Sequence, residues 1–542
     1  MYYLRYLLLA FFLVTLGCAS EQPHASSPLI STQPDSLAFA QAGHNALLAS
    51  EGFRRSRLFI DGWLAHADPA TGLIPRNLTQ SRDIWNAKDA AADNYPFMVL
   101  TAALTDRPLF EGRMTDMLKT EIRLTSRIGA LPDTYSFSKK TFDDAEPDLG
   151  RILFGTSEYI KDGLLPLTEW LGPSPWSDRM IAMLDDAWSR APVQTKWGAI
   201  LSENVELNGE MLQVLARVYW MTGDEKYLDW AIRLGDYYLF GNNHPTRDRA
   251  VLRLRDHGCE VVSGLTELYA TLHFTRPNKK QQYQPLIHEM LDRILEVGRN
   301  EDGLFYNQVN PQSGELVDAK IADNFGYTLN GFYTVYLLNS IEAYRQATRK
   351  ALQTLDAGYR SYAWEGESAD GYADAIKDAL NLYTREPVPE TVNWLDSEIQ
   401  VMWDKQQPDG VIEGWHGDGN FARTSLMYSL WKTQGTHLEP WRADVKWGAV
   451  QKEEALYLHV QADSAWAGVL KFDTPRHQSS LHLPLDWPRI NQFPEWFTVD
   501  ENRSYTLKQS RNQTTGDYAG TDLSNGIPLS LAPGESVHLR VE

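Results

Sequence analysis

The sequence predicts a mainly helical protein, an α/α toroid (a closed barrel of helical hairpins) followed by a small C-terminal β-sandwich domain. Three patterns support this fold. Apolar residues recur at helical spacing in consecutive pairs of segments, a glycine-containing loop pattern returns between the pairs, and strand-like alternation replaces both near the C-terminus. A chain of 542 residues, 43% of them hydrophobic, is large enough for one such helical domain and a smaller one.

The first 18 residues resemble a bacterial lipoprotein signal peptide. Arg5 precedes an apolar run from Tyr6 to Leu16 that is too short to span a bilayer, and Gly17 and Cys18 follow it. In such a signal the cysteine is acylated and becomes the mature N-terminus, although Leu is more usual where Thr15 stands here. We therefore expect a lipid anchor on Cys18 and a place in the bacterial cell envelope. An ordinary secretory signal with a chance cysteine is the alternative.

Residues 19–36 are rich in Ser, Pro and Gln and predict a flexible tether between the lipid and the folded domain. The helical pattern then occupies residues 37–441. Its clearest helical pairs are Asn208–Trp220 with Lys226–Leu239, Gly264–Phe274 with Tyr283–Gly298, Gly331–Tyr344 with Thr348–Gly358, and Tyr372–Tyr383 with Pro389–Lys405. A solenoid of such hairpins is the open-ended alternative, whereas a toroid places the loops around one central cleft.

Between the pairs, a loop of Gly, two apolar residues and then polar or aromatic residues recurs at Gly72, Gly129, Gly198, Gly303 and Gly410. Residues 442–542 read as strands instead. Ala455–Val460, Gly468–Phe472 and Ser536–Val541 alternate apolar and polar residues, with turn residues between them. We therefore expect the β-sandwich domain in this last part of the chain.

The net charge of −20 excludes a nucleic-acid partner, because no basic surface is available for phosphates. The same charge is awkward for a polyanionic substrate, although a cleft can hold local cationic groups within an acidic shell. The mature sequence has no membrane span. No metal-ligand spacing, phosphate-binding loop or nucleophile elbow stands out, so we expect neither a metal nor a cofactor. Cys259, the second of two cysteines, predicts a small buried thiol.

Five loop segments carry more polar and aromatic residues than turns require. His257, with Glu260 three residues on, is the strongest candidate for proton transfer. Each candidate also has a structural alternative, such as a helix cap, a buried hydrogen-bond hub or a tight turn with glycines at positive φ. The candidates in these segments are Asp93, Asn94, Asn204, Asn208, His257, Glu260, Asn324, Tyr327, Trp415, His416, Asp418 and Arg423.

Four stretches of these segments resemble α/α-toroid polysaccharide lyases and the uronyl hydrolases that act after them, with ulvan lyases as the closest association. They are ADNYPF from Ala92, DHGCEVVSGLTELY from Asp256, DNFGYTLNG from Asp323 and GWHGDGNFARTSLMYSLWKTQG from Gly414. The resemblance covers most of the helical domain. It implies β-elimination on an acidic, uronic-acid-containing polysaccharide.

Such a lyase needs a group that neutralises the uronate carboxylate, a base for the C5 proton and an acid for the leaving oxygen. The resemblance implies that His257 and Tyr327 act as base and acid, with Glu260 as a further catalytic candidate. It implies substrate contacts from residues that carry amide, aromatic, imidazole or guanidinium groups. These are Asn94, Asn204, Asn208, Asn324, Trp415, His416 and Arg423.

Two other functions stay open at this point. A glycoside hydrolase acting on uronic-acid oligosaccharides needs a positioned pair of carboxylates, and Asp93, Glu260 and Asp418 are available. A surface lipoprotein that captures glycans without any chemistry would use the same aromatic residues for stacking. Convergence of the His, Tyr and Arg candidates in one cleft favours catalysis, and aromatic residues on an open face favour binding.

Overall fold

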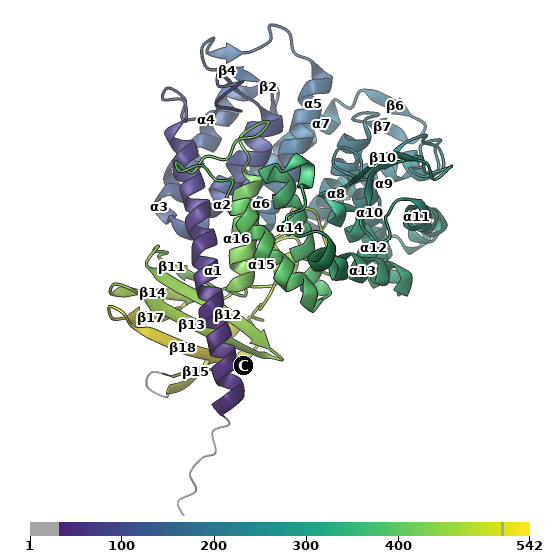
Figure 1. Ribbon diagram of the computed structural model, residues 1–542. Helices are drawn as coiled ribbons and strands as arrows, with labels where there is room; N and C mark the ends of the chain where they lie inside the picture. The colour runs from purple at the N-terminus through teal and green to yellow at the C-terminus, as the bar shows by residue number, and fades with distance from the viewer. Residues whose placement is uncertain (1–31, 511–513) are drawn as a thin grey trace, which may run out of the picture.

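The computed structural model describes residues 32–510 and 514–542, and it confirms the predicted toroid (Figure 1). Within these residues, seven inner helical units form a closed ring in which each unit contacts the next and the last contacts the first. The inner units are η1 with α2 (Ala87–Asn94, Tyr95–Thr105), α5 with η3 and α6 (Leu149–Glu158, Tyr159–Leu164, Leu165–Leu171), α8 (Val205–Thr222), α10 (Glu260–Thr275), α12 (Phe325–Asn339), α14 (Ala369–Arg385) and α16 (Asn420–Lys432).

Outer helices cover this ring and alternate with the inner units along the chain. They are α1 (Thr32–Ala65), α3 with η2 and α4 (Arg107–Leu109, Phe110–Met114, Thr115–Thr125), α7 (Pro175–Ser189), α9 (Glu225–Leu239), α11 (Pro277–Val297), α13 (Glu342–Gly358) and α15 (Pro389–Trp403). Every residue of α16 is buried, whereas α13 buries only one stripe. This difference follows from position, because an inner helix has neighbours on all sides and an outer helix has one face in water.

The five glycine loops all lead from an outer helix into the next inner unit, so they gather at one end of the ring. Gly72, Gly129, Gly198, Gly303 and Gly410 each have positive φ, which glycine adopts without a steric cost. Short strands and one 3-10 turn brace this end. They are β1 (Ile84–Trp85), β2 (Ser126–Ile128), β3 (Leu131–Pro132), β4 (Tyr135–Ser136), β5 (Thr141–Phe142), β6 (Val193–Thr195), β7 (Gly198–Ile200), β8 (Leu252–Arg253), β9 (Tyr306–Val309), β10 (Leu316–Ile321) and η4 (Trp364–Gly366).

The C-terminal part holds two antiparallel sheets. One has the order β11-β14-β17 and the other β12-β13-β18-β15-β16. Inward-facing residues of both, such as Leu458 and Leu470, belong to one hydrophobic cluster. The elements are β11 (His437–Glu439), β12 (Val445–Lys452), β13 (Ala455–Ala462), β14 (Trp466–Lys471), α17 (Arg476–Ser479), β15 (Ser504–Gln509), β16 (Thr514–Ala519), α18 (Gly520–Asn525), β17 (Ile527–Leu531) and β18 (Ser536–Val541). The first strand thus begins shortly before the predicted boundary at residue 442.

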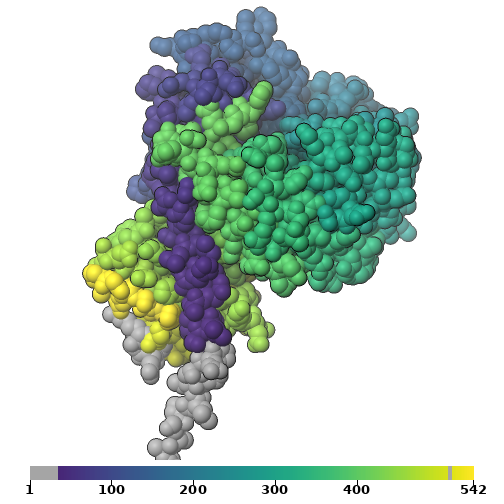
Figure 2. Space-filling model, viewed as in Figure 1, coloured from purple at the N-terminus to yellow at the C-terminus, as the bar shows by residue number. Residues whose placement is uncertain are grey.

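Helix α1 ties the two parts together, and Figure 2 shows it running along the surface from the β domain to the ring. At 34 residues it is about 50 Å long. Its first half lies against the five-stranded sheet, where Tyr457 donates a hydrogen bond to Asp35 at 2.9 Å. A side chain at Gly448 would lie 2.2 Å from the Ala46 nitrogen, so glycine permits this close approach.

Two predicted boundaries are wrong. The tether was expected to reach Ser36, but α1 begins at Thr32 because its first turns already pack on the sheet. The segment Gly331–Tyr344 was expected to be one helix, but α12 ends at Asn339 and Ser340 adopts the left-handed conformation that closes it. The signal peptide, Cys18 and the rest of the tether lie outside the described residues.

Within the described part of the chain, no helix combines the length and apolar character needed to cross a membrane. Cys259 is fully buried, as predicted.

Candidate functional site

A cavity of about 940 Å³ opens at the end of the ring where the inner helices begin. Thirteen carboxylate side chains of the described residues line it, against three cationic ones, Lys88, Lys405 and Arg423. The carboxylates are Asp89, Asp93, Glu158, Asp162, Asp256, Asp323, Glu365, Glu367, Asp370, Asp374, Asp409, Glu413 and Asp418. Such a lining attracts cations and accepts hydrogen bonds from hydroxyl groups, and it repels an anionic ligand.

Two π-helical segments, η1 and η3, lie side by side in the wall of this cavity. A side chain at Gly163 would meet the Ala92 carbonyl oxygen at 2.9 Å, so the two backbones touch where Asp93 and Asp162 project. Short π-helical segments occur often at functional sites. The two segments, with the last residue of α5, bring four of the lining carboxyl groups to one place: Asp89, Asp93, Glu158 and Asp162.

Asp89 and Asp93 lie one helical turn apart in η1 but in opposite environments. Burial raises the pKa of Asp93 to about 8, and the charges of Asp162 and Asp89 add to the effect while His416 opposes it. Burial also acts on Asp89, but His416, Asn86 and Arg76 overcome it and lower the pKa of that carboxyl. Asp93 is therefore the protonated member of the pair at neutral pH, and Asp89 is the ionised one.

Asp162 is held from two sides. Lys161 Nζ lies 2.7 Å from its Oδ1, and Asn491 Nδ2 donates to the same oxygen at 2.9 Å. Its side chain keeps 11% of its surface exposed toward the cavity. The Asp162 carboxylate is therefore held in place by an ammonium group and an amide.

His257 also faces the cavity, as predicted. Its Nδ1 hydrogen-bonds Glu206, and its Nε2 lies 3.1 Å from Asp256. Burial lowers the pKa of His257, but the bond to Glu206 and the charge of Asp256 outweigh it and raise the value. His257, rather than the glycine after it, adopts a positive φ of 68°. An imidazole between two carboxylates is stabilised as the cation.

Glu260, the third predicted catalytic group, does not line the cavity within the described chain. It lies beneath His257 at the start of α10 and accepts a hydrogen bond from the His257 backbone nitrogen at 3.2 Å. Burial and the charge of Asp256 raise the pKa of Glu260 to about 8. Its position is that of a group supporting the loop rather than of one that touches a ligand.

The loop before α16 forms one lip of the cavity. Trp415 is 73% exposed at its tip, and the Arg76 guanidinium lies 5.9 Å from the ring centre. His416 lies beneath, with Nε2 3.6 Å from Asp93. Gly417 and Gly419 do not have positive φ, contrary to the turn alternative. A side chain at Gly419 would instead lie 2.2 Å from the Asp93 carbonyl oxygen, so the glycines permit close packing against η1.

Arg423 and Tyr327 lie at the bottom of the cavity. Arg423 is buried and donates to Asp374 at 2.7 Å and to Asn420 at 2.8 Å. Burial disfavours ionised Asp374, but Lys377 and Arg423 lower its pKa to about 2. The Lys377 ammonium lies 4.1 Å from the centre of the Tyr327 ring. The guanidinium is thus already neutralised within the protein.

Four predicted substrate contacts do not line the cavity within the described residues: Asn94, Asn204, Asn208 and Asn324. Asn204 is the N-cap of α8 and accepts a hydrogen bond from the Leu207 nitrogen, and Asn208 donates to the Ser202 carbonyl. Asn94 and Asn324 are fully buried. Asn204 is therefore a helix cap, which was the structural alternative for this residue. Five other candidates do converge on one cavity: His257, Tyr327, His416, Trp415 and Arg423.

Sequence reasoning missed the carboxylates that project from inside helices, chiefly Glu158, Asp162, Asp370 and Asp374. A signal existed for both helices. Glu158 and Asp162 lie one turn apart in a buried helical run that also holds Lys161, and Asp370 and Asp374 repeat that spacing in α14. Charged residues on a helix buried on all sides need a partner or a functional reason.

Several groups of these side chains have the spacing of a metal site. Oxygen atoms of Glu158, Asp162 and Glu210 lie within 4.8 Å of one another, and carboxylate oxygens suit a hard cation. The Lys161 ammonium already supplies a positive charge next to Asp162. We therefore assign no metal ion to this cluster.

No protein-family model matches the sequence, and no curated relative matches it. Solved structures show distant similarity. An inactive variant of an α-1,6-mannanase of glycoside hydrolase family 76 from Salegentibacter sp., in complex with α-1,6-mannotetrose, has 10% identity and a TM-score of 0.40, covering 70% of this chain and 98% of that chain. A family 76 mannosidase from Bacteroides thetaiotaomicron has 12% identity and a TM-score of 0.38, with the same coverage.

A family 127 β-arabinofuranosidase has 12% identity and a TM-score of 0.36, covering 93% of this chain and 78% of that chain. Similarity at this level carries no argument about the activity or the substrate of this protein.

Proposed function

We propose that the protein is a glycoside hydrolase that acts on a neutral glycan, with Asp93 as the general acid and Asp162 as the base or nucleophile. The observation that carries the proposal is this pair of carboxylates. They project from two touching π-helical segments into one cavity, one protonated and the other held by cationic and amide donors. Cleavage of a glycosidic bond needs two carboxyl groups, one of which donates a proton to the leaving oxygen.

In this mechanism Asp93 donates its proton to the leaving glycosidic oxygen. Asp162 then either activates a water molecule or attacks the anomeric carbon itself. His416, 3.6 Å from Asp93, lies where it stabilises the carboxylate that Asp93 becomes. Trp415 at the lip offers its exposed ring to a sugar face.

The lining disfavours the lyase expected from the resemblance. A lyase must neutralise a uronate, but Arg423, the one guanidinium among the described lining residues, is committed to Asp374, Asn420 and Asn491. The His257 imidazole is likewise held by the carboxylates of Glu206 and Asp256. The lining carboxyl groups that stay ionised, such as Asp89, would also repel an acidic polymer. The hydrolase, considered as an alternative on sequence grounds, fits these charges better, and a neutral substrate replaces the acidic one.

We further propose, from the sequence alone, that the enzyme is anchored in the bacterial cell envelope by a lipid on Cys18. Helix α1 follows the tether directly and packs on the β domain, so the anchor would attach on that side, away from the cavity.

Incubation with a panel of neutral and uronate polymers in ¹⁸O-labelled water tests the proposal. We expect saturated products that carry ¹⁸O at the new reducing end. Asp93→Asn and Asp162→Asn should each lower turnover roughly 10²–10⁴-fold, as expected for loss of general acid–base catalysis. Glu367→Gln, which changes an exposed carboxylate at the rim, is the matched control and should retain activity.

Other products would refute the hydrolase. Unsaturated uronides that absorb in the ultraviolet would indicate elimination. An isomerised sugar without cleavage would indicate an isomerase, and binding without any change of the polymer would indicate a capture protein.

A further inference from the structure

The ring is filled from the end opposite the cavity by a loop of the β domain, which we call the floor loop, residues 474–497. It leaves the β domain at Asp473 and returns beside it, where Asp473 pairs with Thr498 in a parallel bridge. A connection of this length, with one four-residue helix (α17) of its own, is uncommon within a compact fold and is often functional.

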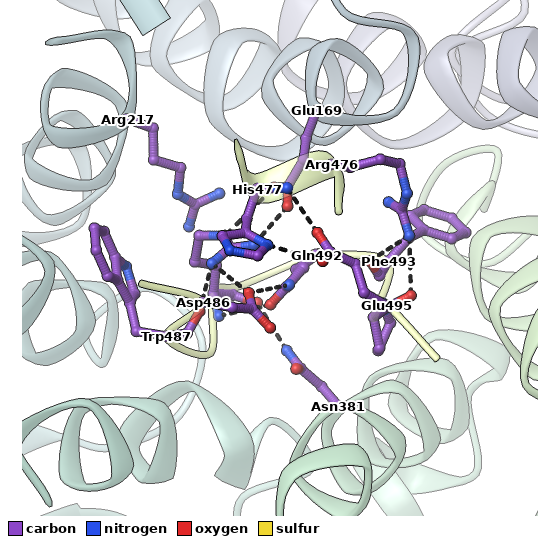
Figure 3. A network of polar contacts seen from close by, with 12 residues as sticks. Glu169, Arg217, Asn381, Arg476, His477, Asp486, Trp487, Gln492, Phe493 and Glu495 are labelled. Atoms are coloured by element: carbon purple, nitrogen blue, oxygen red, sulfur yellow. Dashed lines mark hydrogen bonds and ion pairs between the residues drawn. The ribbon is translucent and has the colours of Figure 1, made fainter. Parts of the chain in front are cut away.

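The floor loop contacts inner helices on several sides of the ring (Figure 3). Arg489 forms a fully buried ion pair with Glu169 of α6, with Nη2 2.6 Å from Oε1. Trp487 donates to Glu267 of α10 at 3.2 Å, and Asn381 of α14 donates to the Arg489 carbonyl at 2.9 Å. These contacts hold the loop inside the ring.

The tip of the loop reaches the bottom of the cavity. Ile490 packs against Tyr327 and Cys259. Asn491, which is 1% exposed, lies between two lining residues that come from different inner units. Its Oδ1 accepts a hydrogen bond from Arg423 at 2.9 Å, and its Nδ2 donates to Asp162 at 2.9 Å.

This arrangement uses both ends of one amide. The carbonyl end faces the guanidinium and the NH₂ end faces the carboxylate, so neither end is interchangeable with the other. Asn491 has a φ of 58°, a left-handed conformation that Asn and Gly tolerate better than other residues. The backbone therefore fixes the position of the Asn491 amide between α16 and η3.

We propose that Asn491 is a positioning residue, through which the β domain fixes Asp162 and Arg423 in the site of the helical ring. The inference rests on the proposed function for its effect on turnover, but not for its effect on geometry. The consequence is that the catalytic arrangement is shared between the two parts of the chain.

The variants Asn491→Gly and Asn491→Asp, made in the full-length protein, test the proposal. Glycine removes the amide and keeps the backbone conformation. Aspartate keeps an acceptor for Arg423 but replaces the donor to Asp162 with a like charge. Asn381→Ala is the matched control, because it releases the same loop from α14 without touching the cavity.

We expect Asn491→Gly to lower kcat roughly 10–100-fold with a smaller change in KM, since it disturbs the transition state more than binding. Asn491→Asp should lower kcat at least as far, because it places a like charge beside Asp162. Asn381→Ala should change the melting temperature but leave kcat close to the parent value.

Crystal structures of the parent and Asn491→Gly supply a readout that does not depend on activity. We expect the Arg423 guanidinium and the Asp162 carboxylate to leave their parent positions, while the inner helices stay in place. Parent-like side-chain positions would overturn the proposal. So would a kcat of Asn491→Gly that equals the kcat of an active parent enzyme. If the parent cleaves no glycan, the proposed function fails, and the crystallographic comparison still decides whether Asn491 positions the two groups.

Discussion

Asp93 destabilises the folded protein at neutral pH, because it is held in an environment that disfavours its charge. The pKa of this carboxyl rises from 3.8 to about 8 on folding. Above pH 4 the unfolded chain releases a proton that the folded protein retains, so the stability of the parent falls as the pH rises from about 4 to about 8. Asparagine carries no charge at any pH in this range and avoids this loss.

The size of the effect follows from the shift. At pH 7 about three pH units separate the medium from the unfolded pKa, which corresponds to at most about 4 kcal/mol at about 1.4 kcal/mol per unit. For roughly 500 folded residues the unfolding entropy is about 1 kcal/mol/K, so Asp93→Asn should raise the melting temperature by up to about 4 °C at pH 7. The gain should be near zero at pH 4. The same variant should also lose activity. A gain in stability together with a loss of turnover is expected for a residue of the site and not for a residue with a purely structural role.

Calorimetry of the parent, Asp93→Asn and Asp89→Asn between pH 4 and 8.5 measures this. Asp89 is the matched control one turn away, and its pKa is lowered by His416, Asn86 and Arg76 despite its burial. Asp89→Asn should therefore lower stability at pH 7, because it removes the charge that Arg76 pairs with. If Asp93→Asn melts below the parent at pH 7, or if their difference is the same at pH 4 and pH 8, our account of the Asp93 environment is wrong.

Four further outcomes are expected. The kcat/KM of the parent should fall above pH 8 as Asp93 loses the proton it donates. An alkaline limb that stays at the same pH in Asp93→Glu would contradict the role of Asp93 as the acid. Trp415→Ala should raise KM about 2–10-fold with kcat unchanged, because an aromatic contact contributes about 0.5–1.5 kcal/mol, and an equal loss of kcat would argue against simple binding. Arg489→Met should lower the unfolding free energy by about 3–5 kcal/mol by leaving Glu169 buried without its partner, and an unchanged melting curve would show that the floor loop is not held as described. Cys18→Ser should release the protein from membranes in a fractionation experiment, and a variant that stays with the membrane would refute the lipid anchor.

Some features of the site follow from local sequence and were predictable. His257, His416 and Trp415 lie in glycine-containing loops that lead into inner helices, and such loops must meet at one end of a closed ring. Asn204 shows the limit of this reasoning. An Asn before a helix is equally suited to cap that helix or to bind a ligand, and here it caps α8.

The reaction chemistry was less predictable, because a pKa depends on groups that are distant in the sequence. Asp93 and Asp162 are far apart in the chain, yet the charge of one raises the pKa of the other. The resemblance to lyases pointed to histidine, tyrosine and arginine. Only the assembled cavity revealed that Arg423 is already paired and that carboxylates dominate the lining.

The sequence by itself determined the helical pairs, the glycine loops between them and the C-terminal strands, because periodicity and turn preference depend on residues a few positions apart. Tertiary structure alone decided which carboxylates meet, which of them keeps a proton, and where residues 474–497 go. No local pattern in that segment marks it as the floor of a ring built from other residues. Arg489 finds Glu169 and Asn491 finds Asp162 only after the ring has closed, because the energy of a buried polar contact exists only when both partners have left water together.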